Sequence, residues 1–140
     1  RKLKPELDDS IKFLVDQFHF EKPGIVKFDV QMPGQCFYWH LDNFGGVLKH
    51  RRQEYDNADE GDLDQRKVMR TMIFLDDQHQ GQIFQLGNLL INWKRGDCIT
   101  WPWRDVPHGT CNYGHKPRPV LNITGIVTEK TKEFLSNATT

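Results

Sequence analysis

Short strand-like segments separated by turn residues recur along most of the chain, and they constrain its fold more than any other feature. Residues 25–32 alternate between polar and apolar side chains and end at Pro33-Gly34, a turn signal. The segments predicted as strands are 25–32, 36–42, 68–75, 81–86, 88–93, 98–101, 108–112 and 118–128, of which the first and the last alternate most clearly. Because no helices alternate with them, we predict a mostly β protein built as a double-sheet jelly roll or related barrel, not a doubly wound parallel sheet.

One amphipathic segment precedes these strands. Apolar residues recur at helical spacing between Pro5 and about His19. They are Leu7, Ile11, Leu14, Val15 and Phe18. We predict a leading α-helix that packs on the outside of a sheet, and we expect the polar tail from Glu129 to form a helical turn.

The bulk composition limits the function classes. A chain of 140 residues with 37% hydrophobic and 27% charged residues is typical of one globular domain, which we assign to 1–140. The formal net charge is zero, whereas a nucleic-acid-binding protein usually carries a basic excess. No apolar run reaches the roughly 18 residues that span a bilayer. We therefore expect neither a nucleic acid nor a membrane as partner, and the oligomeric state cannot be read from these numbers.

The cysteines indicate a reducing environment. There are three, Cys36, Cys98 and Cys111, with no CxxC pair. An odd count without such a pair argues against a disulfide framework and against a thiolate zinc site. We therefore predict a cytoplasmic location.

The run Tyr38-Trp39-His40-Leu41-Asp42 contains the strongest chemical signal. Side chains alternate across a strand, so Tyr38, His40 and Asp42 are predicted to share a face. An imidazole and a carboxylate two residues apart on one face provide half of a metal site. His108, which starts a later strand, is the candidate for the third ligand, and two His with one carboxylate are the ligand set of non-haem Fe(II) oxygenases.

Arg118 adds an anion site to this constellation. It opens the last strand, where Val120 and Leu121 are expected to be buried. A guanidinium that faces a sheet interior is costly unless it meets an anion. A dicarboxylate cosubstrate that chelates the metal would place its far carboxylate within reach of Arg118.

Taken in order, these pieces resemble the 2-oxoglutarate/Fe(II)-dependent oxygenase superfamily, in particular its small prolyl-4-hydroxylase-like members. The resemblance covers about residues 23–127. The matching motifs are Pro33-Gly34-Gln35, Tyr38-Trp39-His40-Leu41-Asp42, Arg70-Thr71-Met72-Ile73-Phe74-Leu75, Lys94-Arg95-Gly96-Asp97-Cys98-Ile99-Thr100-Trp101-Pro102, His108-Gly109 and Arg118-Pro119-Val120-Leu121-Asn122.

The resemblance implies a double-stranded β-helix, the jelly roll also found in cupins. It implies His40, Asp42 and His108 as catalytic iron ligands, and Arg118 as the partner of the 2-oxoglutarate C5 carboxylate. Fe(II), 2-oxoglutarate and O2 are then required, with ascorbate as an optional cofactor. The implied reaction hydroxylates a small-molecule or peptide substrate, with a peptidyl proline as the first candidate, and yields succinate and CO2.

Several assignments stay open on the sequence alone. Tyr38, Asn122 and Thr124, in that order, are candidates to bind the cosubstrate. Arg70 is either a surface residue at the start of its strand or a pocket residue, and Trp101 and Trp103 either line the substrate pocket or pack in the core. The acidic stretch 53–66 is either a lid or a solvated loop.

Two other functions compete with the oxygenase. A cupin-like enzyme could use the metal without 2-oxoglutarate, although such enzymes often have three or four His ligands. A non-catalytic β-sandwich binding module could use its acidic loop, Glu54 to Asp64, as a contact surface. Such a module needs neither Arg118 nor the His40–Asp42 pair.

Overall fold

The computed structural model describes residues 5–21, 23–42 and 67–138. Every predicted strand is present, and most lie within about two residues of the predicted bounds. The elements are α1 (Pro5–Asp16), β1 (Pro23–Gln31), β2 (Cys36–His40), β3 (Val68–Phe74), β4 (Gln82–Leu86), β5 (Leu89–Leu90), β6 (Cys98–Thr100), β7 (His108–Asn112), β8 (Arg118–Ile126) and α3 (Glu129–Ser136). The predicted acidic loop at 53–66 lies outside the described residues.

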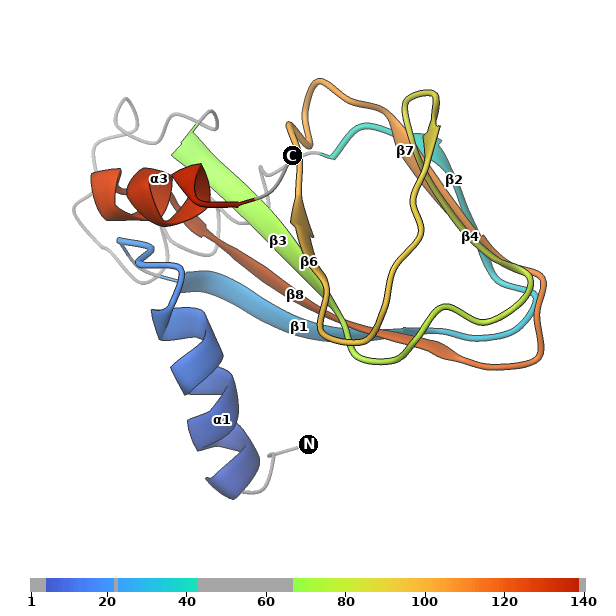
Figure 1. Cartoon of the computed structure of the whole chain (residues 1–140), viewed down its shortest axis with the longest axis horizontal. Coiled ribbons are helices and arrows are strands. Elements are labelled where there is room, and N and C mark those ends of the chain that lie inside the picture. Colours follow the sequence, from blue (N-terminus) through green and yellow to red (C-terminus); the bar gives the residue numbers. More distant parts are fainter. Residues whose placement is uncertain (1–4, 22, 43–66, 139–140) are drawn as a thin grey trace, which may run out of the picture.

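The strands form two four-stranded antiparallel sheets whose order is that of a double-stranded β-helix. One sheet has the order β1-β8-β3-β6 and the other β2-β7-β4-β5. The two sheets face each other, and α1 and α3 lie away from the β2-β7-β4-β5 sheet (Figure 1). The predicted jelly roll is therefore confirmed.

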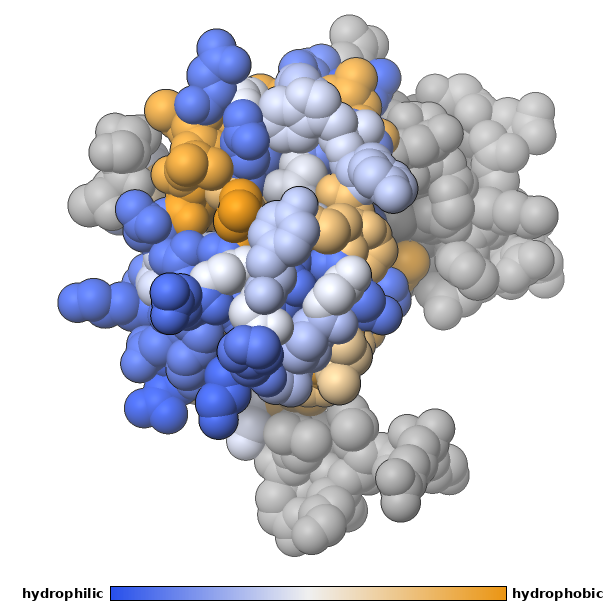
Figure 2. Space-filling model, turned by 90° about the vertical axis from the view of Figure 1, so that its right-hand side faces the viewer, coloured by the Kyte–Doolittle hydropathy of each residue, from blue (hydrophilic) through white to orange (hydrophobic). Residues whose placement is uncertain are grey.

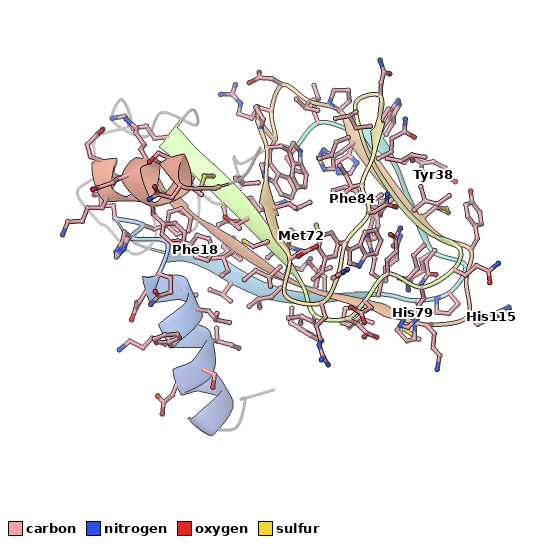
Figure 3. The ribbon with its side chains drawn as sticks, viewed as in Figure 1. Phe18, Tyr38, Met72, His79, Phe84 and His115 are labelled. Carbon is pink, nitrogen blue, oxygen red and sulfur yellow. A yellow bond between two sulfur atoms is a disulfide. The ribbon has the colours of Figure 1, made fainter. Side chains whose placement is uncertain are left out.

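The two central strands of the first sheet, β3 and β8, carry buried apolar side chains on both faces. Met72 and Phe74 of β3 point between the sheets and pack with Phe84 and Trp93. Figure 3 shows Met72 and Phe84 in this interior. The same face, which points between the sheets, also carries Arg70 and Arg118. Apolar side chains therefore surround these two arginines.

The opposite face of the same sheet receives the leading helix. Ile73, Leu121 and Ile123 pack there against Val15 and Phe18 of the α1 region. Burial of an aliphatic or aromatic side chain of this size contributes about 1.5–3 kcal/mol. The prediction that this helix packs on the outside of a sheet is confirmed.

The C-terminal tail forms more regular structure than we predicted. Thr128 caps α3, and its side-chain oxygen accepts a hydrogen bond from the backbone N–H of Thr131. The Thr131 hydroxyl is buried and donates to the carbonyl of His19, which ties the helix to the N-terminal region. A full helix therefore replaces the expected helical turn. Neither described helix is long and apolar enough to cross a lipid bilayer.

The prediction about cysteines was wrong in one respect. Cys36 and Cys111 form a disulfide, whereas Cys98 is free. The reason is register: antiparallel pairing of β2 with β7 sets Cys36 directly opposite Cys111. Residues far apart in sequence that face each other across two strands are not visible as a CxxC-type pattern. The cytoplasmic location stays a prediction.

Candidate functional site

His40, Asp42 and His108 converge between the two sheets. His40 ends β2, His108 starts β7, and the pairing of these strands sets the two histidines directly opposite each other. The Asp42 Oδ1 atom lies 3.5 Å from His40 Nε2 and 3.9 Å from His108 Nε2. One ligand atom from each of the three residues lies within 4.8 Å of the others, so the group could hold a metal ion.

Both imidazoles are oriented for ligation through Nε2. His40 Nδ1 lies 2.6 Å from the Tyr38 carbonyl oxygen, and His108 Nδ1 lies 3.4 Å from that of Val106. A carbonyl can only accept, so each Nδ1 is set to carry the proton and each Nε2 keeps its lone pair for a metal. Burial lowers the pKa of His108 below its usual value, which favours the neutral, metal-binding form of the ring.

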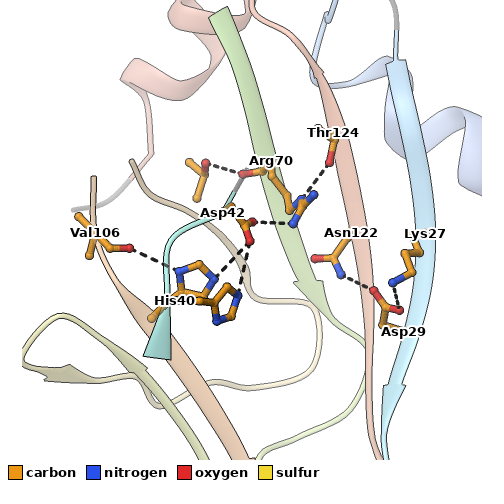
Figure 4. A network of polar contacts seen from close by, with 10 residues as sticks. Lys27, Asp29, His40, Asp42, Arg70, Val106, Asn122 and Thr124 are labelled. Carbon is orange, nitrogen blue, oxygen red and sulfur yellow. Dashed lines mark hydrogen bonds and ion pairs between the residues drawn. The ribbon is translucent and has the colours of Figure 1, made fainter. Parts of the chain in front are cut away.

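Arg70 is a pocket residue, which resolves one alternative that the sequence left open. Its Nη1 donates to Asp42 Oδ2 at 2.6 Å, and its Nε donates to the Thr124 hydroxyl at 3.0 Å (Figure 4). The sequence did contain a signal for this position. Arg70 alternates with Val68 and Met72 on β3, so it interrupts an otherwise apolar, inward-facing series.

The three converging residues and Arg118 line the same pocket, which has a volume of about 320 Å³. The pocket is walled by side chains of both sheets. It is lined by Lys27, Asp29, Val30, Gln31, Phe37, His40, Asp42, Arg70, Met72, Phe84, Trp103, His108, Thr110, Arg118, Val120 and Asn122. The structure therefore brings Arg118 and the three ligand candidates into one cavity.

Arg118 is buried as a cation without an anion among the described residues. Arg118 is only 5% exposed, and its Nε and Nη1 atoms have no hydrogen-bond partner among the described residues. The guanidinium carbon lies 5.8 Å from the Phe84 ring centre and 5.7 Å from that of Trp93. Burial lowers the pKa of Arg118 to about 10, so it remains charged at neutral pH. Aromatic faces stabilise such a cation only in part, and an anionic ligand in the pocket would complete its coordination.

Two of the three candidate cosubstrate contacts lie outside this pocket. Asn122 does line it, and its Oδ1 is buried without a hydrogen-bond partner in the described structure. Thr124 is buried but binds Arg70 and does not line the cavity. Tyr38 is 88% exposed and points away from the interior (Figure 3).

The position of Tyr38 has a local cause. The pairing of β2 with β7 is irregular between Phe37 and His40. An extra residue in one strand of a pair reverses the alternation of side chains beyond it. As a result Phe37, not Tyr38, lines the pocket together with His40. The predicted shared face of Tyr38 and His40 is therefore corrected, and no role at the site follows for Tyr38 from this arrangement.

The two tryptophans before His108 differ in their surroundings. Both are buried and stack on one another, and both rings contact His108 edge-on. Trp103 also lines the pocket, whereas Trp101 packs in the core against Phe84. Of the two tryptophans, Trp103 therefore lines the pocket and Trp101 packs in the core.

Comparisons with known proteins add information on fold only. No protein-family model matches the sequence, and no curated protein matches it. Solved structures that resemble the chain include a predicted oxalate decarboxylase from Thermotoga maritima, with a TM-score of 0.48 and 12% identity over 89% of this chain and 76% of the other.

Two further similar structures are also cupin or double-stranded β-helix proteins. The Cnp3 cupin domain of Schizosaccharomyces pombe has a TM-score of 0.48 and 8% identity, and the match covers 81% of this chain and 59% of that one. An uncharacterized double-stranded β-helix protein from Klebsiella pneumoniae has a TM-score of 0.46 and 16% identity, over 76% and 70% of the two chains. At these identities the likeness concerns the fold and does not assign an activity.

Proposed function

We propose that the protein is a non-haem Fe(II) dioxygenase that uses 2-oxoglutarate as cosubstrate. In the overall reaction, one oxygen atom of O2 enters succinate and the other converts a substrate C–H group into C–OH, with release of CO2. His40, Asp42 and His108 are the proposed iron ligands, and Arg118 is the proposed partner of the C5 carboxylate.

The observation that carries the proposal is the shared pocket. A two-histidine, one-carboxylate group at one place in it matches the donor set that binds Fe(II) and leaves coordination positions open. Arg118, at another place, is a buried guanidinium with two nitrogen atoms, Nε and Nη1, that lack a partner in the described structure. A ligand that chelates a metal at one end and carries a carboxylate at the other satisfies both groups at once.

The protein's own residues account for the placement of this ligand. Arg118 would bind the distal carboxylate, and the apolar side chains of Met72, Phe84 and Val120 exclude water around that ion pair. The Nδ1–H groups of the two histidines are held by backbone carbonyls, which keeps the metal-binding nitrogens turned into the pocket. Iron bound there, together with 2-oxoglutarate, supplies the activation of O2 needed for C–H hydroxylation.

The substrate remains a broader proposal. A peptidyl proline is the first candidate, from the sequence resemblance, and small molecules are the alternative. Lys27, Asp29 and Phe37 contribute to the pocket wall and are partly or fully exposed, so they are available to contact a substrate.

Anaerobic spectroscopy tests the proposal directly. Addition of Fe(II) and 2-oxoglutarate to the wild type is expected to give a visible metal-to-ligand charge-transfer band, and Asp42→Ala is expected to abolish it. Arg104→Gln, which changes an exposed arginine outside the pocket, serves as the control and should retain the band. Exposure to O2, with and without ascorbate, should then produce succinate.

Two results would count against the proposal in different ways. If the wild type binds Fe(II) but 2-oxoglutarate produces neither a band nor succinate, the cupin-like metal enzyme without this cosubstrate is favoured. If the wild type binds no metal and Asp42→Ala behaves identically, the metal centre itself is refuted. If instead the wild type forms succinate, a screen of peptides and metabolites for stimulated succinate formation would identify its substrate.

A further inference from the structure

Asp42 lies beyond the last residue of β2, so strand pairing does not orient its side chain. β2 ends at His40, the residue that pairs with His108. The backbone N–H of Asp42 donates to the carbonyl of Trp103 at 3.2 Å, which fixes the main chain but leaves the carboxylate free to rotate. A proposed metal ligand in this position requires another group to hold it.

The two carboxylate oxygens of Asp42 have different environments. Oδ1 faces both histidine Nε2 atoms, at 3.5 and 3.9 Å. Oδ2 accepts a hydrogen bond from Arg70 Nη1 at 2.6 Å. Charge-assisted bonds of this length are among the stronger hydrogen bonds in proteins. The carboxylate therefore presents one oxygen to the metal position while the other is already engaged.

Arg70 is itself fixed from two further directions. Its Nε donates to Thr124 of β8, and its guanidinium carbon lies 5.1 Å from the centre of the Trp103 ring. Trp103 in turn contacts His108 edge-on. The rigid guanidinium plane of Arg70 thus contacts Asp42, Trp103 and Thr124 of β8 at once.

We propose that Arg70 is a positioning residue that restricts Asp42 to binding the metal through Oδ1 alone. This inference rests on the metal centre of the proposed function and goes beyond it. Binding through a single oxygen matters because a bidentate carboxylate would occupy one more coordination position. The two-histidine, one-carboxylate arrangement needs three positions open for the cosubstrate and O2.

Cobalt(II) titration of the purified protein separates this role from a purely electrostatic one. If Arg70 were only a nearby positive charge, it would repel the metal dication, and removal of the Arg70 charge should tighten metal binding. A positioning residue has the opposite effect, because loss of a ligand's hydrogen-bond partner typically weakens metal binding by about 10- to 100-fold. We expect Arg70→Gln to weaken Co(II) binding by about that factor, and to change the cobalt d–d absorption spectrum as the carboxylate changes its binding mode.

Three further variants control the result. Arg70→Lys keeps the charge but loses the planar fork, so its affinity and spectrum should resemble those of Arg70→Gln more than those of the wild type. Thr124→Val removes only the bond that holds Arg70 Nε, and a smaller effect of the same sign is expected. Arg104→Gln should leave both affinity and spectrum unchanged. Thermal unfolding of the metal-free variants checks that each is folded.

The outcomes distinguish the inference from the function on which it rests. If the wild type binds Co(II) and both Arg70→Gln and Thr124→Val bind it equally or more tightly with the wild-type spectrum, the positioning role is overturned and the metal centre stands. If the wild type binds no Co(II), both are overturned. Should Arg70→Gln not fold, Arg70→Lys and Thr124→Val decide the question in the same way.

Discussion

Arg70 and Arg118 lie on neighbouring strands of one sheet and line the same pocket, yet their surroundings are opposite. Arg70 donates to Asp42 and Thr124, so its charge is paired within the protein. Arg118 is more deeply buried and has two nitrogen atoms without a hydrogen-bond partner among the described residues. A paired buried arginine orients its partner, whereas an unpaired one is an incomplete site for an external anion. Under the proposed function, the Asp42 end of the pocket would hold the metal and the Arg118 end would hold the cosubstrate's carboxylate.

The largest expected effect is a loss of 2-oxoglutarate affinity, without a loss of metal affinity, when Arg118 is replaced. Arg118→Met should weaken 2-oxoglutarate binding by about 100-fold or more, because a bidentate bond to a desolvated carboxylate is lost. Its Co(II) affinity should stay close to wild type. Calorimetric titration of the cobalt-loaded protein with 2-oxoglutarate measures this.

Arg70→Gln should show the reverse pattern, with the loss in metal binding. If Arg118→Met instead reduced metal and 2-oxoglutarate binding equally, the two arginines would not act at separate ends, and the comparison would fail.

Stability should respond to the two arginines with opposite signs. In the ligand-free protein, Arg118→Met replaces an uncompensated buried cation by an apolar side chain, and we expect the free energy of unfolding to rise by about 1–3 kcal/mol. Arg70→Met leaves Asp42 Oδ2 without its donor, and a decrease of about 1–2 kcal/mol is expected. Urea unfolding without metal measures both. A decrease in both variants would show that Arg118 is satisfied in the ligand-free state.

The smallest expected effect concerns Asn122, a pocket residue between the metal end and the carboxylate end. Asn122 lies on β8 between Arg118 and Thr124, and its Oδ1 is buried without a partner in the described structure. An amide oxygen can only accept a hydrogen bond, so this atom cannot bind a carboxylate, and Asn122 Nδ2 already donates to Asp29 Oδ2. Asn122→Ala should therefore weaken 2-oxoglutarate binding by at most about 3-fold, the lower end of the effect of one lost hydrogen bond. Metal affinity should be unaffected. A loss of about 10-fold or more in cosubstrate affinity would instead indicate that Asn122 donates directly to the cosubstrate.

Much of this arrangement could be predicted because it depends on local patterns. The period-two alternation fixed the strands, and the inward position of Arg118 follows from the same alternation with Val120 beside it. The convergence of His40 with His108 required only that their strands pair, which the jelly-roll order provides.

The features that sequence reasoning missed depend on exact register and on tertiary contacts. The irregular pairing between Phe37 and His40 turned Tyr38 outward, and no residue type in that stretch marks it. The same register brought Cys36 opposite Cys111. The Arg70–Asp42 pair joins β3 to the residues that follow β2 of the other sheet, so no periodicity within a single strand predicts it.

The disulfide between Cys36 and Cys111 closes a covalent ring, with the two cysteines 75 positions apart in the sequence. His40, Asp42, Arg70 and His108 all lie within that ring, whereas Arg118 lies outside it. Even when the barrel is unfolded, the three proposed metal ligands therefore remain at a raised effective concentration relative to one another. Under oxidising conditions the metal end of the pocket is expected to reassemble before the anion end, and reduction of the bond removes that advantage.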